Sequence, residues 1–254
     1  MRIVCKEQHT AEWFQEKLGR VSASNMHLAM DFVSKGSKAR GDKRIESSAA
    51  RNKYIRQIAM ELITREPTEH YVSPAMDHGT SFESEARRAY ALRRECMVDQ
   101  TGFVLHPTLN YLGASPDGLI LPTHIVELKC PTYDTHLEYL DTGIFPKKYI
   151  LQVHCTRLCC GVEYGELVSY YAPNPQLDMP YLPERFRMII QRIDADAEID
   201  RRMEEAATQT MEEATALVGR LIGQYPEIDQ PKAEKAELEG GITDDDIAWA
   251  QANL

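Results

Sequence analysis

The chain has 254 residues, among which 39 acidic residues outnumber 29 Lys and Arg, so its formal net charge is -10 at pH 7. A hydrophobic fraction of 43% and a charged fraction of 27% are typical of globular proteins, and they exclude a chain that is disordered, collagen-like or membrane-embedded as a whole. Spread evenly, this negative charge would also argue against a nucleic-acid partner.

The N-terminal segment and the cysteines both indicate a cytoplasmic protein. Residues 1–10 lack the basic and apolar regions of a secretory leader, and no run of residues reaches the roughly 18 apolar positions that span a bilayer. The six cysteines form no CxxC pair and lie mostly in apolar runs. This distribution predicts free, buried thiols in a reducing compartment.

The first part of the chain predicts two capped helices followed by a basic segment. Thr10 and Ser22 are good N-cap residues, and we expect helices over 11–19 and 23–30. Between positions 35 and 56 the chain carries eight basic and two acidic residues, a local balance of +6. We expect a basic loop that runs into a third helix.

The remainder predicts a mixed α/β domain. Residues 79–95 have helix-forming composition, and the short alternating runs up to position 131 are typical of a strand meander. A helix over about 147–160, strands over 162–173 and 185–193, and a long amphipathic helix over about 195–222 follow. This order predicts a sheet with helices on its faces.

The C-terminal segment has a different character. We expect a single folded domain over 1–225 and a flexible acidic tail over 226–254, where eight acidic residues face two basic ones. The end of the tail, 244–254, is either a short amphipathic docking segment or part of an unstructured solubilising tail.

Two motifs predict a site for phosphodiester hydrolysis, SPDG at 115–118 and VELK at 126–129. If Asp117 ends one strand and the second motif lies on the next, Glu127 and Lys129 share a face beside Asp117. Two carboxylates then hold a Mg²⁺ ion, to which the Leu128 carbonyl adds an oxygen ligand. Lys129 orients or deprotonates the attacking water. Each motif alone is common in turns and strands.

A further acidic residue is expected from the preceding helix. Glu83 near its start is the candidate for a third ligand or for the support of a second metal, and Glu85 is the competitor. The two residues point to different faces of the helix, so one of them is an ordinary solvated residue. The paired arginines that follow, Arg87 with Arg88 and Arg93 with Arg94, either extend a DNA-binding surface or are simply solvated.

An ordered set of motifs resembles the phage lambda exonuclease family, the YqaJ-type viral recombinase nucleases of the PD-(D/E)XK superfamily. The resemblance spans about residues 10–195 and rests on the order of the motifs, since no single motif carries it. They are Trp13, LGRVSAS (18–24), HGTSFE (78–83), GASPDG (113–118), VELKCP (126–131) and YILQVH (149–154). The resemblance implies a restriction-endonuclease-like core with a mixed central sheet flanked by helices.

The resemblance also implies roles for single residues. Asp117 and Glu127 correspond to the principal metal ligands, Lys129 to the catalytic lysine that positions water, Glu83 to the helix-borne carboxylate and Gln152 to a glutamine that reaches toward the site. For the 5′ phosphate of the DNA end it implies Ser24 and a cation. The family arginine after the Trp is here Lys17, with Arg20 close by, so either residue is a candidate.

The family implies a Mg²⁺-dependent exonuclease, with Mn²⁺ as a substitute, that digests one strand of linear duplex DNA from its 5′ end. The product, a 3′ overhang, is passed to a single-strand annealing protein, and the enzyme is a homotrimer in the cytoplasm of a bacterial host. The basic segment then contacts the DNA backbone, through Lys35, Lys38, Arg40, Lys43 and Arg44. The tail alone holds a balance of -6, so the acidic total does not exclude DNA.

Two alternatives stay open. One is a Cas4-like exonuclease with an iron–sulfur cluster, for which the candidate ligands are Cys130, Cys155, Cys159 and Cys160, although their spacing is poor. The other is a DNA-end-binding accessory protein without catalytic activity. The intact set of Asp117, Glu127 and Lys129 argues against it.

Overall fold

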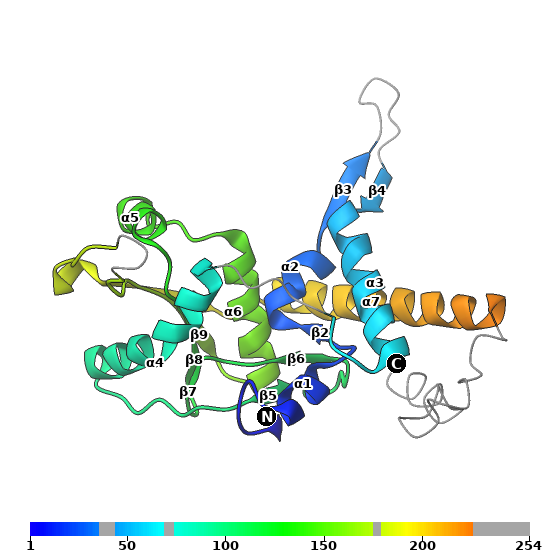
Figure 1. Cartoon of the computed structure of the whole chain (residues 1–254), viewed down its shortest axis with the longest axis horizontal. Helices are drawn as coiled ribbons and strands as arrows, with labels where there is room; N and C mark the ends of the chain where they lie inside the picture. Colours follow the sequence, from blue (N-terminus) through cyan, green and yellow to red (C-terminus); the bar gives the residue numbers. More distant parts are fainter. Residues whose placement is uncertain (36–43, 69–73, 175–178, 226–254) are drawn as a thin grey trace.

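The computed structural model describes residues 1–35, 44–68, 74–174 and 179–225. Within these ranges the chain forms two mixed four-stranded sheets and a two-stranded hairpin, flanked by helices (Figure 1). The predicted class, a mixed α/β fold with helices on the sheet faces, is confirmed. One expectation needs correction, because the sheet is divided in two.

The first sheet has the strand order β1-β5-β6-β2. It consists of β1 (Arg2–Cys5), β2 (Val21–Ser22), β5 (Phe103–Leu105) and β6 (Leu112–Ala114). β2 runs parallel to β6, and the other pairs are antiparallel. Helix α1 (Ala11–Lys17) begins as predicted, because the Thr10 side chain accepts a hydrogen bond from the Trp13 amide.

The second sheet has the order β10-β9-β8-β7 and carries the candidate catalytic residues. Its strands are β7 (Gly118–Ile120), β8 (His124–Lys129), β9 (Tyr164–Tyr170) and β10 (Met188–Asp194). Residues 115–117 leave β6 and enter β7. Pro116 in this turn has no amide hydrogen to donate to a ladder, which is a physical reason for the division at this point.

The parallel pair β8 and β9 is joined by α5 (Tyr133–Thr142) and α6 (Lys147–Cys160), the crossover that parallel strands require. α6 has the predicted bounds, and Val153 packs against Ile125 and Leu167 on one face of the sheet. Gly165 permits this close approach, since a Cβ atom there would lie 2.4 Å from Cγ1 of Val153.

Helix α4 (Pro74–Arg94) covers the opposite face of the same sheet. Ala86 and Tyr90 pack there against Val126 and Leu128 of β8. Because side chains alternate along a strand, Glu127 and Lys129 point to the other face, toward α6. The 3-10 helix η4 (Glu184–Phe186) precedes β10.

The third group of elements comprises α3 (Ala49–Thr64), α7 (Ala197–Gln224) and the antiparallel hairpin of β3 (Phe32–Lys35) and β4 (Arg44–Ser47), which projects from the rest of the molecule (Figure 1). Buried Arg51 joins α3 to α7 through Glu213, 2.9 Å away. The segment expected as a basic loop therefore includes two strands.

The predicted helix over 23–30 is also different in the structure. It consists of the 3-10 turn η1 (Ala23–Asn25) and the single turn α2 (Met26–Ala29). Ser22 belongs to β2 and makes no capping hydrogen bond; its hydroxyl lies 3.1 Å from that of Ser24. Pairing with β6 thus determines the conformation of Ser22 in place of helix capping.

The acidic segment 226–254 lies outside the described residues, so the domain boundary at 225 stays a prediction. Helix α7 ends at Gln224, close to that boundary. None of the helices in the described ranges combines the length and the apolar composition needed to cross a bilayer.

Candidate active site

The edge of the second sheet brings Asp117 to Glu127. Asp117 comes directly before β7, and not at the end of a strand as the sequence suggested. The antiparallel register pairs Gly118 with Val126, so Asp117 lies opposite Glu127. Its Oδ2 accepts a hydrogen bond of 2.7 Å from the amide of Leu128, which ties the turn to β8.

Glu127 and Lys129 contact each other on the α6 face of β8. The Nζ atom of Lys129 donates to Oε1 of Glu127 over 2.7 Å, and the amide of Gln152 on α6 donates to the same oxygen. Glu127 is 1% exposed, and its other oxygen, Oε2, is buried without a partner among the described residues. The Tyr149 ring lies 5.0 Å from Lys129 Nζ.

Glu83 on α4 faces the same site from the sheet edge. It pairs with Arg87 one helical turn later, and Nε of Arg87 donates to the Asp117 carbonyl over 2.6 Å. Glu85 points elsewhere: its Oε1 accepts from the Tyr170 hydroxyl at 2.7 Å and from Arg187 at 3.1 Å. Of the two acids only Glu83 lines the cleft, whereas Glu85 is paired with Arg187 and its side chain is 41% exposed.

The pKa values of Glu127 and Glu83 are raised by their surroundings. Burial, followed by the charge of Asp117, raises the pKa of Glu127 to about 8 and that of Glu83 to about 7. Burial alone would lower the pKa of Lys129, but the charges of Glu127 and Asp117 outweigh it and the pKa is raised. The shifts of Glu127 and Glu83 thus favour their protonated forms, and the shift of Lys129 favours its charged form.

The site opens into a cleft of about 460 Å³ whose lining includes Glu83, Asp117, Leu128, Lys129 and Tyr149. The donor set fits a hard divalent cation: Oε2 of Glu127 has no partner among the described residues and is an oxygen atom of the kind that such a cation prefers, and Leu128 lies at the cleft wall. The described residues contain no ready-made cluster of three acidic, His or Cys side chains for a metal. Glu83 pairs with Arg87 through Oε1 and is not part of such a cluster in the described arrangement.

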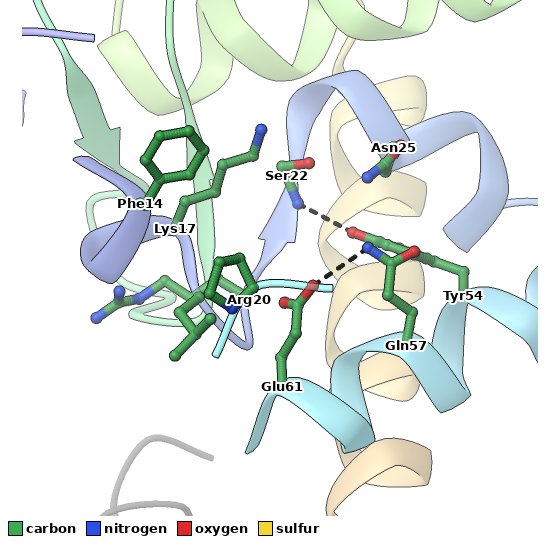
Figure 2. A pocket seen from close by; sticks show the side chains of 10 residues that line it. Phe14, Lys17, Arg20, Ser22, Asn25, Tyr54, Gln57 and Glu61 are labelled. Atoms are coloured by element: carbon green, nitrogen blue, oxygen red, sulfur yellow. Dashed lines mark hydrogen bonds between the residues drawn. The ribbon is translucent and has the colours of Figure 1, made fainter. Parts of the chain in front are cut away.

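A second, small cavity of about 70 Å³ lies beside α1, and its lining includes Lys17, Arg20, Ser22, Tyr54 and Glu61. In Figure 2 the ammonium group of Lys17 lies beside Ser22. Its Nζ atom also lies 4.7 Å from the Trp13 ring. Burial lowers the pKa of Lys17, and the charge of Glu61 opposes this.

The other two residues expected at the 5′ phosphate are placed differently. The Arg20 guanidinium points away from Ser22 (Figure 2); it pairs with Glu16, and its Nε donates to the Asn110 carbonyl over 3.0 Å. Ser24 is exposed and contacts Ser22, but it does not line the cavity. Lys17 is therefore the better placed of the two cations.

Three contacts of the site were not predicted from the sequence. Nε1 of Trp13 donates to the Ser115 hydroxyl over 2.7 Å, which connects α1 to the turn before Asp117. Arg87 and Tyr149 contact Glu83 and Lys129 as described above. The only signal was proximity in sequence: each lies within four residues of a predicted site residue.

The residues expected to contact the DNA backbone lie largely outside the described part of the chain. Lys38, Arg40 and Lys43 are not among the described residues, and for Lys35 and Arg44 only the strand backbone is described. The projection of the hairpin is the observation that bears on them.

Three of the four candidate iron–sulfur ligands lie on α6, and the fourth, Cys130, lies apart from them after β8. Cys130 packs with α4, Cys160 packs with the core under α6 and β9, and Cys155 and Cys159 belong to the core between α3, α6 and α7. All four are buried free thiols. This placement matches the predicted buried thiols and gives no support to the Cas4-like alternative.

The fold, with mixed sheets flanked by helices, is of the PD-(D/E)XK nuclease type. The chain belongs to the YqaJ-like viral recombinase domain family, which matches residues 12–163. The resemblance drawn from the motifs is thereby confirmed. No curated protein sequence is significantly similar to the chain.

Solved structures agree with this assignment. The alkaline exonuclease LHK-Exo from Laribacter hongkongensis is 28% identical with a TM-score of 0.72, over 86% of this chain and 100% of that one. Its complex with dAMP matches over the same shares at 29% identity and a TM-score of 0.72. A phage-related exonuclease from Haemophilus somnus 129PT shares the fold, with 14% identity and a TM-score of 0.61 over 80% of this chain and 96% of that one. The chain is accordingly a nuclease of DNA recombination.

Proposed function

We propose that the protein is a Mg²⁺-dependent exonuclease that digests one strand of linear duplex DNA in the 5′ to 3′ direction and leaves a 3′ overhang. The observation that carries this proposal is that Glu83, Asp117 and Lys129 line one cleft, while the buried Glu127 is hydrogen-bonded to Lys129. The dAMP complex of LHK-Exo adds support, because a nucleoside monophosphate is the product that stepwise digestion releases.

The metal ligands in this proposal are Asp117, Glu127, the Leu128 carbonyl and Glu83. When bound there, Mg²⁺ polarises the scissile phosphate and makes water a better nucleophile, and Mn²⁺ offers the same chemistry. Gln152 holds Glu127 by donating to Oε1, which leaves Oε2 available as a ligand. Such supporting contacts fix the direction of a ligand and its affinity for the metal.

Lys129 serves as an ammonium group. Because its pKa is raised by the neighbouring acids, it keeps its proton at neutral pH. It therefore orients the attacking water and stabilises negative charge on the phosphate, and the other possibility raised by the sequence, proton abstraction by a neutral amine, is disfavoured.

The strand end is held at the cavity beside α1. Lys17 supplies a point charge for a terminal 5′ phosphate, and the hydroxyls of Ser22 and Ser24 are 3.1 Å apart next to it. Trp13 contacts both Lys17 and Ser115, so end binding is connected to the turn that carries Asp117. Arg20 has a structural role in this scheme.

The deciding experiment uses a linear duplex labelled separately at the 5′ and 3′ ends of each strand. We expect release of 5′ label first, as mononucleotide, only with Mg²⁺ or Mn²⁺, and faster from ends that carry a 5′ phosphate. Initial release of 3′ label would contradict the direction. Binding without any cleavage in Mg²⁺ would favour the end-binding accessory alternative.

Two partners complete the proposal. A homotrimer around the DNA would keep the substrate enclosed, and the projecting hairpin would bring basic residues to the backbone. A single-strand annealing protein would receive the overhang through the acidic segment 226–254. Sedimentation equilibrium tests the first point, and a pull-down with and without residues 226–254 tests the second.

A further inference from the structure

A second cleft, distinct from the small cavity beside α1, adjoins the cleft of about 460 Å³ at Glu83. Its volume is about 550 Å³, and Thr80 and Glu83 line both clefts. Lys6, His9 and Arg87 provide its basic side chains, opposite a carboxylate at Glu7. A nucleic-acid strand that crosses the site at Glu83 would therefore enter a polar cleft with cationic groups.

Arg87 stands at the junction of the two clefts. Its guanidinium pairs with Glu83, and its Nε donates 2.6 Å to the Asp117 carbonyl. The ion pair is not fully buried, with side-chain exposures of 12% for Arg87 and 24% for Glu83. Water reaches this pair, and a doubly charged ligand can compete with Arg87 for the carboxylate.

The carboxylate of Glu83 has two competing uses. In the described arrangement it is bound by Arg87, whereas the proposed metal site requires it as an oxygen ligand. A divalent ion attracts a carboxylate more strongly than a guanidinium does, because its two charges are concentrated on one small centre. A cation that takes Glu83 as a ligand would therefore compete with Arg87 for this carboxylate.

We propose that Arg87 is a positioning residue that exchanges partners: it holds Glu83 while the site lacks a cation, and it binds a phosphodiester group of the DNA strand in the second cleft once the cation has taken Glu83. The planar guanidinium suits this second partner, since it donates to two phosphate oxygens at once. This inference rests on the proposed metal role of Glu83.

The exchange links cation binding to DNA binding. In the absence of a cation, Arg87 is engaged and contributes little to DNA affinity. In its presence, Arg87 is released and adds one phosphate contact. Because binding linkage is reciprocal, DNA also strengthens cation binding by the same factor.

The first test measures Ca²⁺ binding by calorimetry without DNA, since Ca²⁺ occupies oxygen sites and supports binding without hydrolysis. Arg87→Met is compared with Arg88→Met, which removes the same charge from an exposed position on the same helix. We expect Arg87→Met to bind Ca²⁺ about threefold or more tightly than Arg88→Met, because the competitor for Glu83 is gone. Equal or weaker binding by Arg87→Met would overturn the exchange.

The second test measures affinity for a 5′-phosphorylated duplex in EDTA and in Ca²⁺. We expect Arg87→Met to lose about threefold or more in affinity in Ca²⁺ and little in EDTA, whereas Arg88→Met changes both affinities alike. An equal loss for Arg87→Met under the two conditions would contradict the exchange.

Two controls separate this inference from other failures. Absence of Ca²⁺ binding in the unmodified protein would refute the metal site of the proposed function, a result distinct from unchanged Ca²⁺ affinity in Arg87→Met. If Arg87→Met does not fold, as judged by its thermal transition in EDTA, Arg87→Lys replaces it. The lysine keeps the charge but cannot reach Glu83 and the Asp117 carbonyl together, so the same increase in Ca²⁺ affinity over the unmodified protein is expected.

Discussion

Lys129 and Glu127 point to the same face of β8, and the ammonium group lies 2.7 Å from Oε1 of the buried carboxylate. The lysine thus supplies a hydrogen bond to one oxygen of the buried carboxylate. The other oxygen, Oε2, has no partner among the described residues. This pair leaves one carboxylate oxygen for the cation that the proposed function requires. The predictions below follow from this arrangement and from its neighbours.

Replacement of Lys129 by Ala is expected to lower the cleavage rate by about 10²-fold or more, because a charge aimed at the scissile phosphate is lost. Binding of duplex DNA in Ca²⁺ should be retained. Lys148→Ala is the matched control, since Lys148 lies 4.8 Å from the same Tyr149 ring. Single-turnover rates measure the effect, and full activity of Lys129→Ala would refute the assignment.

Replacement of Gln152 by Leu removes a donor to Glu127 while it keeps the volume of the side chain. We expect cation affinity to fall by about 10-fold, as is usual when a group that supports a metal ligand is lost. Calorimetry with Mn²⁺ measures it. The neighbouring α6 residue Lys147, exposed at the start of the helix, provides the control variant Lys147→Leu, and an equal change in both variants would contradict a specific role.

Cation binding should depend strongly on pH. An acid whose pKa is raised in the folded state binds protons more tightly there than when unfolded, so cation-free stability falls as pH rises from about 4.5 through 8. Cations compete with those protons, so Mn²⁺ affinity should be roughly tenfold or more higher at pH 8 than at pH 6. Thermal shifts with Mn²⁺ and with EDTA across this range measure it, and Glu83→Gln should weaken the dependence near pH 7.

Recognition of the 5′ phosphate should depend on Lys17 and not on Arg20. We expect Lys17→Met to remove most of the rate difference between ends with a 5′ phosphate and ends with a 5′ hydroxyl. Arg20→Met should keep that difference and lower the thermal transition, because Arg20 bonds to Glu16 and to the Asn110 carbonyl. The reverse pattern would assign the phosphate to Arg20.

Replacement by alanine should have opposite effects on stability at two glycines, Gly165 in β9 and Gly219 in α7. Gly165→Ala should destabilise the protein by about 1–3 kcal/mol, because the new Cβ would lie 2.4 Å from Val153. Gly219→Ala in α7 meets no atom within 4 Å and should stabilise the protein by about 0.5–1 kcal/mol. Chemical denaturation of both variants measures the difference.

The sequence predicted the elements with strong local signals. α6 has the expected bounds, and α7 begins and ends within about two residues of expectation. The alternation of β8 placed Glu127 and Lys129 on one face. Local patterns were sufficient because each of these elements buries one regular face.

Features that depend on long-range contacts were not predictable in the same way. Ser22 is a good cap residue by composition, but pairing between β2 and β6 places it in a strand. Arg87 has the pattern of a solvated helix residue, yet the fold brings it to the Asp117 carbonyl, 30 positions away.

The amide of Gln8 has a consequence for shortening the chain from its N-terminus. Its Nε2 atom donates to the carbonyls of Thr101 and Pro116, at 3.1 and 2.9 Å. The segment after β1 is thus hydrogen-bonded to Pro116, the residue before Asp117. Deletion of the first eight residues would remove the edge strand β1 and both hydrogen bonds from Gln8. The turn before Asp117 would then be held less firmly, so we expect a truncated protein that is still soluble to have lost activity.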